Sequence, residues 1–326
     1  MAHDIDTTKG FNAIAYRGET PWHGLGQQMV TGQTIEEWQT AAGMDFEVHP
    51  TAIYYLNPLN AKPQIVPGKK TLIRSDTGTA LSVVSEAFKP VQPKEIMEFY
   101  RDLTAKSGFE LETAGVLKGG AKYWALASMG KEAKIMDDKI KGYLLLGSAC
   151  DGSMATTAMF TSVRVVCNNT LGFAMQEAES GKAKNVVKVY HRSEFDMDKV
   201  KAQLGLAATS WSSFLSRVEH WSESPVSADQ AKQYFETVAS YNTTDGDTVI
   251  SKKVNEKLMS LYSGAGMGSE LKSAKNTVWG LINAVTEYVD HHRGRTNEVR
   301  LDRAWFGDGV NTKEKAIELA EQLVLA

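Results

Sequence analysis

ELETAGVLKGGAKYWALASM (110–129) decides the fold class, because two strand-like apolar runs flank a short glycine loop. This pattern predicts two strands joined as an antiparallel hairpin. IKGYLLLGSAC (140–150) and MATTAMFTSVRVV (154–166) continue the pattern, with the glycine-containing loop CDGSM between them. Four successive strands without an intervening helix favour an antiparallel or mixed sheet over a doubly wound parallel one.

Further strands are predicted on both sides of this stretch. They are TAIYYLN (51–57), TLIRSD (71–76), ALSVVS (80–85) and KNVVKVYH (184–191), with DTG (76–78) as a hairpin turn. PKEIMEFYRDLTAKSG (93–108) predicts a helix that begins at a proline and ends at a glycine. NNTLGFAMQEAES (168–180) also has a helical pattern.

From Ser193 onward the strand pattern gives way to helical periodicity. Helices are predicted at 194–221, 227–241, 248–262, 269–292 and 312–325. Ser227 and Gln230 resemble a capping box at the start of the second of these helices. The sequence therefore predicts an α+β protein. An antiparallel or mixed β-sheet core with flanking helices and an N-terminal arm (1–192) precedes a helical C-terminal region (193–326).

The composition excludes several classes of protein. The chain has 326 residues, of which 42% are hydrophobic and 23% charged, as in ordinary globular proteins. No apolar run approaches the ~18 residues of a membrane span, and the N-terminus lacks the pattern of a signal peptide. Cys150 and Cys167 are too few for a disulfide framework. We expect a cytoplasmic protein with no membrane partner, and a net charge of −3 still permits a local basic groove.

Six strings of the sequence stand out when taken together: PWHGLG (21–26), ALSVVSEAFKPVQPKEIMEFY (80–100), GSACDGSMA (147–155), TSVRVVCNNTL (161–171), TVWGLINAVTEYVDHHR (277–293) and RAWFGDGVNTKEKA (303–316). Together they resemble one family, the phage/plasmid-like proteins, also called domain of unknown function 932. The resemblance covers most of the chain. It implies a mobile genetic element in a bacterial host but no defined activity.

Basic and aromatic residues are interleaved between Lys118 and Lys201. Cations that hold phosphates and rings that stack on bases are what a groove for single-stranded nucleic acid requires. The alternative is a set of solvated lysines that protect strand edges. The candidate nucleic-acid-binding residues are Lys118, Lys122, Tyr123, Trp124, Lys141, Arg164, Lys184, Lys188, Tyr190 and Arg192. Arg164, which lies within an apolar strand, could equally pair with a carboxylate.

Cys167 lies where a predicted strand meets a predicted helix. A thiol at a helix N-terminus can be activated as a nucleophile, with His23 or His191 as a base. The alternative is a buried small residue, with Asn168 or Asn169 capping the helix.

Glu287, Asp290 and His291 share one face of a predicted helix. Three groups on one helical turn rarely complete a metal shell, so the pattern favours a polar network or salt bridges to Arg293, Arg295 or Arg300 over a metal site. The sequence predicts no catalytic residue, no metal and no cofactor.

These observations give three hypotheses for function. The first is a single-stranded DNA-binding protein of a phage or plasmid, active in recombination by strand annealing and assembled as a homo-oligomer. The second is an interaction protein that inhibits a host defence or repair factor. The third is a cysteine-dependent enzyme.

Overall fold

The computed structural model describes residues 5–18, 24–106, 108–164, 170–172, 186–204, 207–293 and 308–325. The chain divides into two compact units. The first comprises Met1–Gly130, Tyr143–Met159 and Glu177–Gly205, and the second comprises Lys131–Gly142, Phe160–Gln176 and Leu206–Ala326. The sequence predicted one boundary after residue 192, whereas the second unit also takes in parts of the strand-rich half.

The main sheet has the strand order β10-β9-β8-β7-β6-β1-β2, and β11 also pairs with β9. The strands are β1 (Ile14–Arg17), β2 (Gln27–Met29), β6 (Glu110–Leu117), β7 (Lys122–Ile135), β8 (Asp138–Ala149), β9 (Thr156–Arg164), β10 (Thr170–Gly172) and β11 (Val186–Val189). β1 and β2 run parallel, whereas β6 runs antiparallel to both β1 and β7. The sheet is therefore mixed, and the predicted α+β class is confirmed.

Helix α2 (Pro93–Lys106) supplies much of the core of the first unit. Its Ile96, Met97, Phe99 and Tyr100 side chains are fully buried. The Tyr100 hydroxyl lies 2.8 Å from the backbone oxygen of Ala125 on β7 and 2.9 Å from that of Leu144 on β8. Burial of this ring raises the pKa of Tyr100 well above its ordinary value, so the hydroxyl remains a neutral donor. Helix and sheet are thus joined by apolar packing and a satisfied polar contact.

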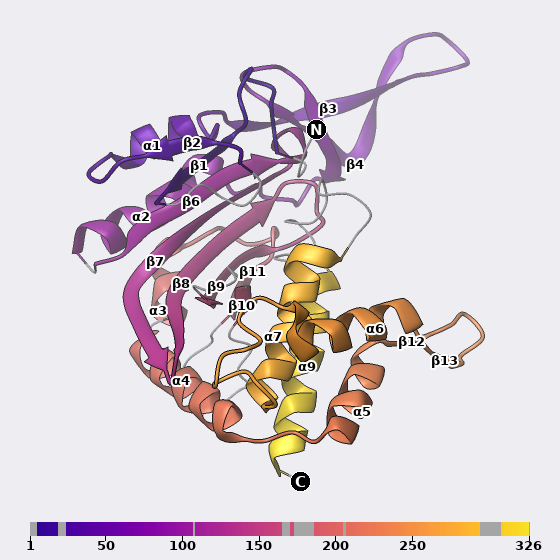
Figure 1. The fold of residues 1–326 in the computed structure, drawn as a ribbon. Helices are drawn as coiled ribbons and strands as arrows, with labels where there is room; N and C mark the ends of the chain where they lie inside the picture. Colours follow the sequence, from indigo (N-terminus) through magenta and orange to yellow (C-terminus); the bar gives the residue numbers. More distant parts are fainter. Residues whose placement is uncertain are drawn as a thin grey trace. The chain divides into compact units, whose positions relative to one another are not determined.

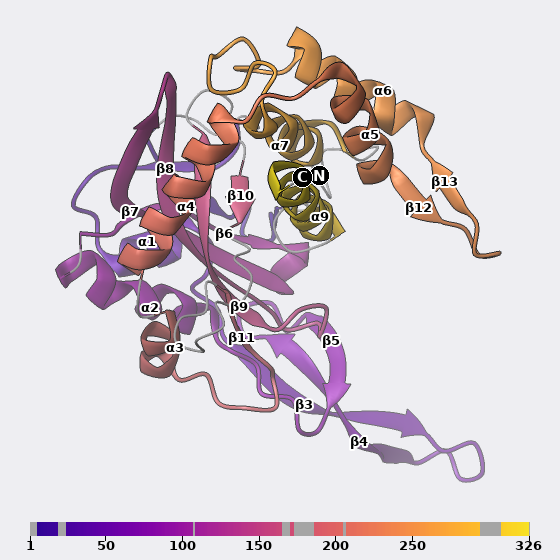
Figure 2. The ribbon, with the colours of Figure 1, turned by 90° about the horizontal axis from the view of Figure 1, so that it is seen from below.

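A second, three-stranded sheet has the order β3-β4-β5 and consists of β3 (Val48–Leu56), β4 (Pro63–Arg74) and β5 (Ala80–Ser85). The inner part of β4, from Lys70 to Ile73, pairs with both neighbours, whereas its outer part, from Pro63 to Ile65, pairs with β3 alone. The β3–β4 hairpin therefore continues beyond β5 as a two-stranded ribbon, which projects from its unit in both views (Figures 1 and 2).

The ribbon carries features that limit pairing with other chains. Pro50 lies on β3, Pro63 and Pro67 lie on β4, and the register shifts between Ala52 and Tyr54. Proline has no N–H to donate, and a bulge interrupts the ladder, so both discourage edge-to-edge aggregation. The two-stranded ribbon can thus remain exposed to solvent without pairing with the strands of other chains.

The second unit is mainly helical. It contains α4 (Ala207–Glu223), α5 (Ala228–Val238), α6 (Lys252–Ser260), α7 (Val278–Glu287) and α9 (Asp308–Leu325), with a short hairpin of β12 (Ser240–Asn242) and β13 (Thr248–Ile250). Helix α7 is buried along its whole length and packs against α4 and α9. Trp221 of α4 stacks on Trp279 of α7, with ring centroids 6.2 Å apart. No helix in the described part of the chain combines the length and apolar character needed to cross a bilayer.

The turn between β7 and β8 belongs to this helical unit because two aspartates tie it there. Asp138 accepts a hydrogen bond from Nε1 of Trp279 at 3.0 Å. Asp137 accepts the backbone N–H groups of Lys272 and Ser273 at 2.8 and 3.2 Å. These long-range contacts explain why a boundary drawn along the sequence at residue 192 does not match the spatial division.

Three of the predicted helices differ from the structure. The predicted helix 194–221 is two helices, α3 (Met197–Leu204) and α4, with Gly205 between them in the sequence. The prediction for 248–262 begins as strand β13. The prediction for 269–292 becomes α-helical only at Val278, because Asn276 takes a left-handed φ of 55° and Thr277 caps the helix. The capping box of Ser227 and Gln230 is confirmed.

Residues 168–180 were predicted to be helical. Within this stretch the structure describes residues 170–172, which form strand β10 and pair with Thr161–Val163 of β9. The helical assignment is therefore wrong for these three residues, because pairing with a neighbouring strand outweighs local propensity.

Candidate nucleic-acid interface

Three of the predicted binding residues lie inside the core of the first unit. Tyr123 and Trp124 are each 1% exposed, and Lys122 is 5% exposed. The Tyr123 hydroxyl donates to the backbone oxygen of Val91, and a Cβ on Gly115 would lie 2.5 Å from the Trp124 ring. Rings packed in this way cannot stack on bases, so we correct the prediction that these residues line a groove.

The remaining predicted residues are dispersed. Lys118 is exposed, and Lys141 is half-buried in the second unit. Lys188 on β11, together with Tyr190 and Arg192, is exposed in the first unit. Lys184, Cys167, Asn168 and Asn169 lie outside the described residues, as does the side chain of Arg164 on β9.

Tyr190 and Arg192 flank a histidine that is firmly held. The His191 ring stacks on Phe88, with centroids 4.4 Å apart, and its Nδ1 lies 3.1 Å from the backbone oxygen of Lys89. Phe88 and Lys89 follow β5 in the chain, after Glu86 and Ala87. The exposed pair therefore belongs to a segment fixed against the residues that follow the three-stranded sheet.

The exposed cations and rings of that sheet lie on the β3–β4 hairpin. From Val48 to Ser75 the sequence contains no Asp or Glu, but it contains Lys62, Lys69 and Lys70. Lys62 and Lys69 are exposed, and Nζ of the half-buried Lys70 donates to the backbone oxygen of Glu86 at 2.8 Å. In the part of the chain that the structure describes, these lysines form no ion pair. We call β3, β4 and their connecting loop the basic hairpin.

Aromatic and aliphatic side chains line both faces of its outer part. Tyr54 is 61% exposed and pairs in register with Ile65 of β4, while Leu56 on the same face pairs with Pro63. Tyr55 is 46% exposed on the opposite face. Its hydroxyl donates to Oε1 of the paired Gln64 at 2.6 Å, which holds the ring across the ribbon. Each face thus presents a tyrosine to solvent.

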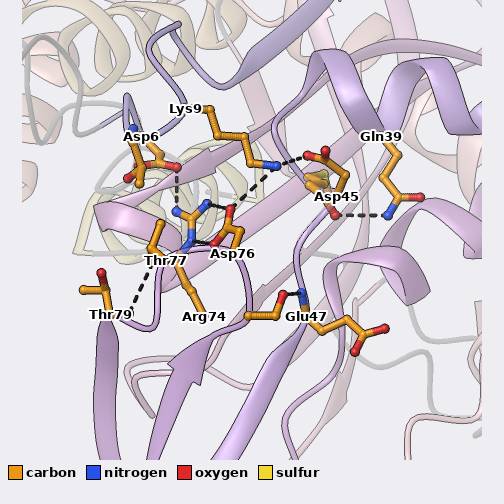
Figure 3. Close-up of polar contacts among 12 residues, drawn as sticks. Asp6, Lys9, Gln39, Asp45, Glu47, Arg74, Asp76, Thr77 and Thr79 are labelled. Carbon is orange, nitrogen blue, oxygen red and sulfur yellow. Dashed lines mark hydrogen bonds and ion pairs between the residues drawn. The ribbon is translucent and has the colours of Figure 1, made fainter.

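The base of the basic hairpin is anchored by a buried cation. Figure 3 shows the guanidinium of Arg74, at the end of β4, between Asp6 and Asp76. Its Nη1 lies 2.7 Å from Asp6, and its Nε and Nη2 lie 3.0 and 2.8 Å from the two oxygens of Asp76. Nη1 also donates to the backbone oxygen of Gly119 at 2.9 Å, and the guanidinium lies 4.1 Å from the Phe46 ring centroid.

This network extends to Lys9, whose Nζ contacts Asp45 and lies 3.6 Å from Asp76 (Figure 3). Hydrogen bonds from Arg74 hold the pKa of Asp76 below its ordinary value. Because Arg74 is fully buried and also contacts Asp6 and Gly119 from distant segments, the network fixes the basic hairpin to the core.

The cysteine that the structure describes is not an activated thiol. Cys150 is fully buried, and burial raises the pKa of its thiol to about 12. It is therefore a protonated thiol at neutral pH. The cysteine-dependent enzyme hypothesis then depends on Cys167, which lies outside the described residues.

A cavity of about 410 Å³ in the first unit offers no free cation to an anionic ligand. Its two lining arginines are each paired, Arg17 with Glu110 at 2.5 Å and Arg101 with Glu36 at 2.5 Å. Bonds to Glu98 and Glu36 raise the pKa of Arg101, so this guanidinium stays charged and engaged.

The predicted polar cluster on the long helix lies at the end of α7 and in the π-helical turn Tyr288–His292. Glu287 accepts the backbone N–H of Met267 at 3.0 Å, and Asp290 pairs with the buried Lys313 of α9 at 2.5 Å. His291 lies in the same turn. The residues thus join a polar network, in which Asp290 contacts Lys313 and Arg293 pairs with Asp308, whereas Arg295 and Arg300 lie outside the described residues.

No group of three or more His, Cys, Asp or Glu among the described residues is arranged to hold a metal ion.

The site and the fold together define an α+β protein with a projecting basic hairpin. Residues 80–305 match the family described as Domain of unknown function (DUF932), so the chain belongs to that family, as its motifs predicted. No curated protein and no solved structure matches the chain. The basic hairpin precedes the matched residues and is therefore described by the structure alone.

Sequence reasoning missed Tyr54, Tyr55, Lys62, Lys69 and Lys70. Lysines interleaved with aromatic residues form a longer stretch after Lys118, and the prediction rested on that stretch, although carboxylates are also frequent there. The signal that could have located the hairpin is the absence of Asp and Glu from Val48 to Ser75.

Proposed function

We propose that this protein binds single-stranded DNA through the basic hairpin. The observation that carries the proposal is the projecting ribbon without carboxylates, which combines three lysines with an exposed tyrosine on each face. This replaces the wider set of residues after Lys118, of which Lys188, Tyr190 and Arg192 remain candidates for secondary contacts.

The lysines account for attraction to the sugar-phosphate backbone. Cations that neutralise phosphates release condensed counterions, so affinity falls as salt rises. For single strands the log–log slope is about −0.7 per neutralised phosphate, which gives about −2 if Lys62, Lys69 and Lys70 each hold one. These side chains form no ion pair with the described residues, so no salt bridge among those residues must break before a phosphate binds, although Nζ of Lys70 also donates to the backbone oxygen of Glu86.

The tyrosines account for contact with bases. A ring stacked on a base contributes about 1–3 kcal/mol regardless of sequence, and single strands present base faces that a duplex conceals. On one face of the ribbon Tyr54 lies beside Ile65 and Leu56, which extends the platform available to a base. The predicted binding is therefore tolerant of sequence and selective for unpaired strands.

Strand annealing is a further part of this proposal. A ribbon that holds phosphates and stacks on base faces leaves the pairing edges open to an incoming strand. We also propose a homo-oligomer, in the cytoplasm of a bacterial host and in the service of a phage or plasmid, on the strength of the motif resemblance alone.

The test is fluorescence anisotropy with labelled oligothymidylate and the full chain, between ~50 and ~200 mM salt. The expected result is saturable binding whose log–log salt slope is about −2. Absence of binding, or binding insensitive to salt, would overturn the proposal. Equal affinity for a duplex of the same length would overturn the preference for single strands. Capture of a host protein without any DNA binding would favour the interaction-protein hypothesis instead.

A further inference from the structure

The tip of the basic hairpin presents an apolar side chain almost entirely to solvent. Leu59 is 93% exposed, between Pro58 and Asn60 in the loop that joins β3 to β4. Leu56 and Ile65, just behind the tip, are 67% and 58% exposed. The projecting end of the ribbon therefore presents an apolar side chain to solvent within a loop that also contains Asn57 and Asn60.

This loop is held in one conformation by its own hydrogen bonds. Asn57 closes it, because its N–H donates to the backbone oxygen of Lys62 at 2.9 Å and its backbone oxygen accepts the N–H of Ala61 at 2.8 Å. The side-chain oxygen of Asn57 accepts the N–H of Leu59 at 2.9 Å, and that of Asn60 accepts the N–H of Lys62 at 3.0 Å. Leu59 is thus kept outward and does not fold back on the ribbon.

We propose that Leu59 is a wedge that enters between two adjacent bases of the strand held by the basic hairpin. This inference rests on the proposed function, because it requires DNA on the ribbon. Rigid apolar side chains can enter base steps, where they replace one stacked neighbour and exclude water. A loop fixed in advance spends no binding free energy on its own ordering.

The charges around the tip favour a polynucleotide over a protein pocket as the occupant. Lys62 is exposed three residues from Leu59 and lies in the loop directly before β4, where it can hold a phosphate beside the opened step. The segment from Val48 to Ser75 contains no carboxylate to repel phosphates. Tyr54 and Tyr55 lie further along the same ribbon and can stack on the bases that flank the step.

The test uses an oligodeoxyadenylate with one 2-aminopurine, whose fluorescence is quenched by stacking on its neighbours. The probe position is moved along the strand, and binding is followed in parallel by anisotropy. We expect full-length wild-type protein to raise the fluorescence at one or two positions by at least about twofold. L59A is expected to bind within about tenfold of wild type and to lose that rise, and L59M is expected to retain it. V30A, which shortens an exposed apolar side chain outside the basic hairpin, serves as the matched control and should behave as wild type.

The possible outcomes distinguish failure of the wedge proposal from failure of the DNA-binding proposal. If wild type binds without a rise, or if L59A keeps the rise, the wedge is wrong and the proposed function stands. If no oligonucleotide binds, both fail. If, in addition, sedimentation detects dimers that L59A dissociates, the tip contacts a second copy of the chain and the wedge is also overturned.

Discussion

Strand β7 and the basic hairpin carry the same kinds of side chain and present them in opposite ways. On β7, Lys122, Tyr123 and Trp124 lie between two neighbouring strands, and all three are buried. On the hairpin, Tyr54 and Tyr55 have a partner strand on one side only, and both are exposed. The comparison teaches that composition alone does not identify a binding surface.

The physical difference is the number of elements that cover each region. β7 pairs with both β6 and β8, and Tyr100 of α2 reaches its backbone. The outer part of β4 lies beyond the end of β5, so the ribbon there has no third strand. Lysines and rings on a covered strand pack into the core, whereas the same residues on an uncovered ribbon remain available to a ligand.

The largest effect is expected from Arg74, the buried cation at the base of the hairpin. R74A removes the buried cation that contacts both Asp6 and Asp76, which should lower the free energy of unfolding by about 3–5 kcal/mol. Urea unfolding followed by tryptophan fluorescence measures this change. The control is R17A, which removes a partly exposed pair with Glu110 and should cost about 1 kcal/mol or less. Equal effects of the two variants would contradict the anchoring role.

Removal of one exposed ring should weaken DNA binding without weakening the fold. Y54A is expected to raise the Kd for oligothymidylate by about 5- to 150-fold, because one stacked base contributes about 1–3 kcal/mol. Y241A provides the control, since Tyr241 on β12 is 55% exposed but lies in the second unit. Anisotropy titrations compare them. A similar loss in both variants would show that tyrosine exposure, rather than position on the hairpin, determines binding.

The lysines of the basic hairpin should govern the salt dependence of binding. Replacing Lys62, Lys69 and Lys70 together by Gln is expected to reduce the magnitude of the log–log salt slope by about 2. The same change at three exposed lysines of the second unit, Lys232, Lys252 and Lys253, should leave the slope unchanged. If the second triple variant has the larger effect, the hairpin is not the main phosphate contact.

The smallest expected effect is on how the free energy of unfolding changes at acidic pH. Because Arg74 holds the pKa of Asp76 below its ordinary value of 3.8, the stabilisation is present above that value. It is lost as pH falls through the lowered pKa, where the carboxylate becomes protonated in the folded state. Urea unfolding at pH 3 to 7 should therefore show a steeper decline below about pH 4 for wild type than for D76N. Parallel curves would contradict the assignment of Asp76 as a charged partner of Arg74.

Local pattern predicted several elements well. The apolar and β-branched residues of β5, and the proline-initiated apolar face of α2, placed both elements at or near their observed bounds. The capping box at Ser227 was visible because all its atoms lie within four residues. Properties that depend on neighbours in sequence were therefore accessible.

Properties that depend on distant segments were not accessible. The burial of Trp124 follows from neighbouring strands and from close packing against Gly115, which a pattern of residues does not reveal. The contact between Asp290 and Lys313 joins two separate helices, which local spacing does not reveal. The projection of the hairpin depends on where β5 ends relative to β4, which is a matter of register.

Photo-cross-linking of the full chain to an oligonucleotide that contains 5-iodouracil tests the central claim most directly, because it identifies the side chains that touch bases. The account predicts that mass spectrometry finds the cross-links on the peptide that contains Tyr54 and Tyr55, and that Y54A together with Y55A removes them. Cross-links confined to the segments around Tyr190 or around Lys118, with none on the hairpin, would contradict it.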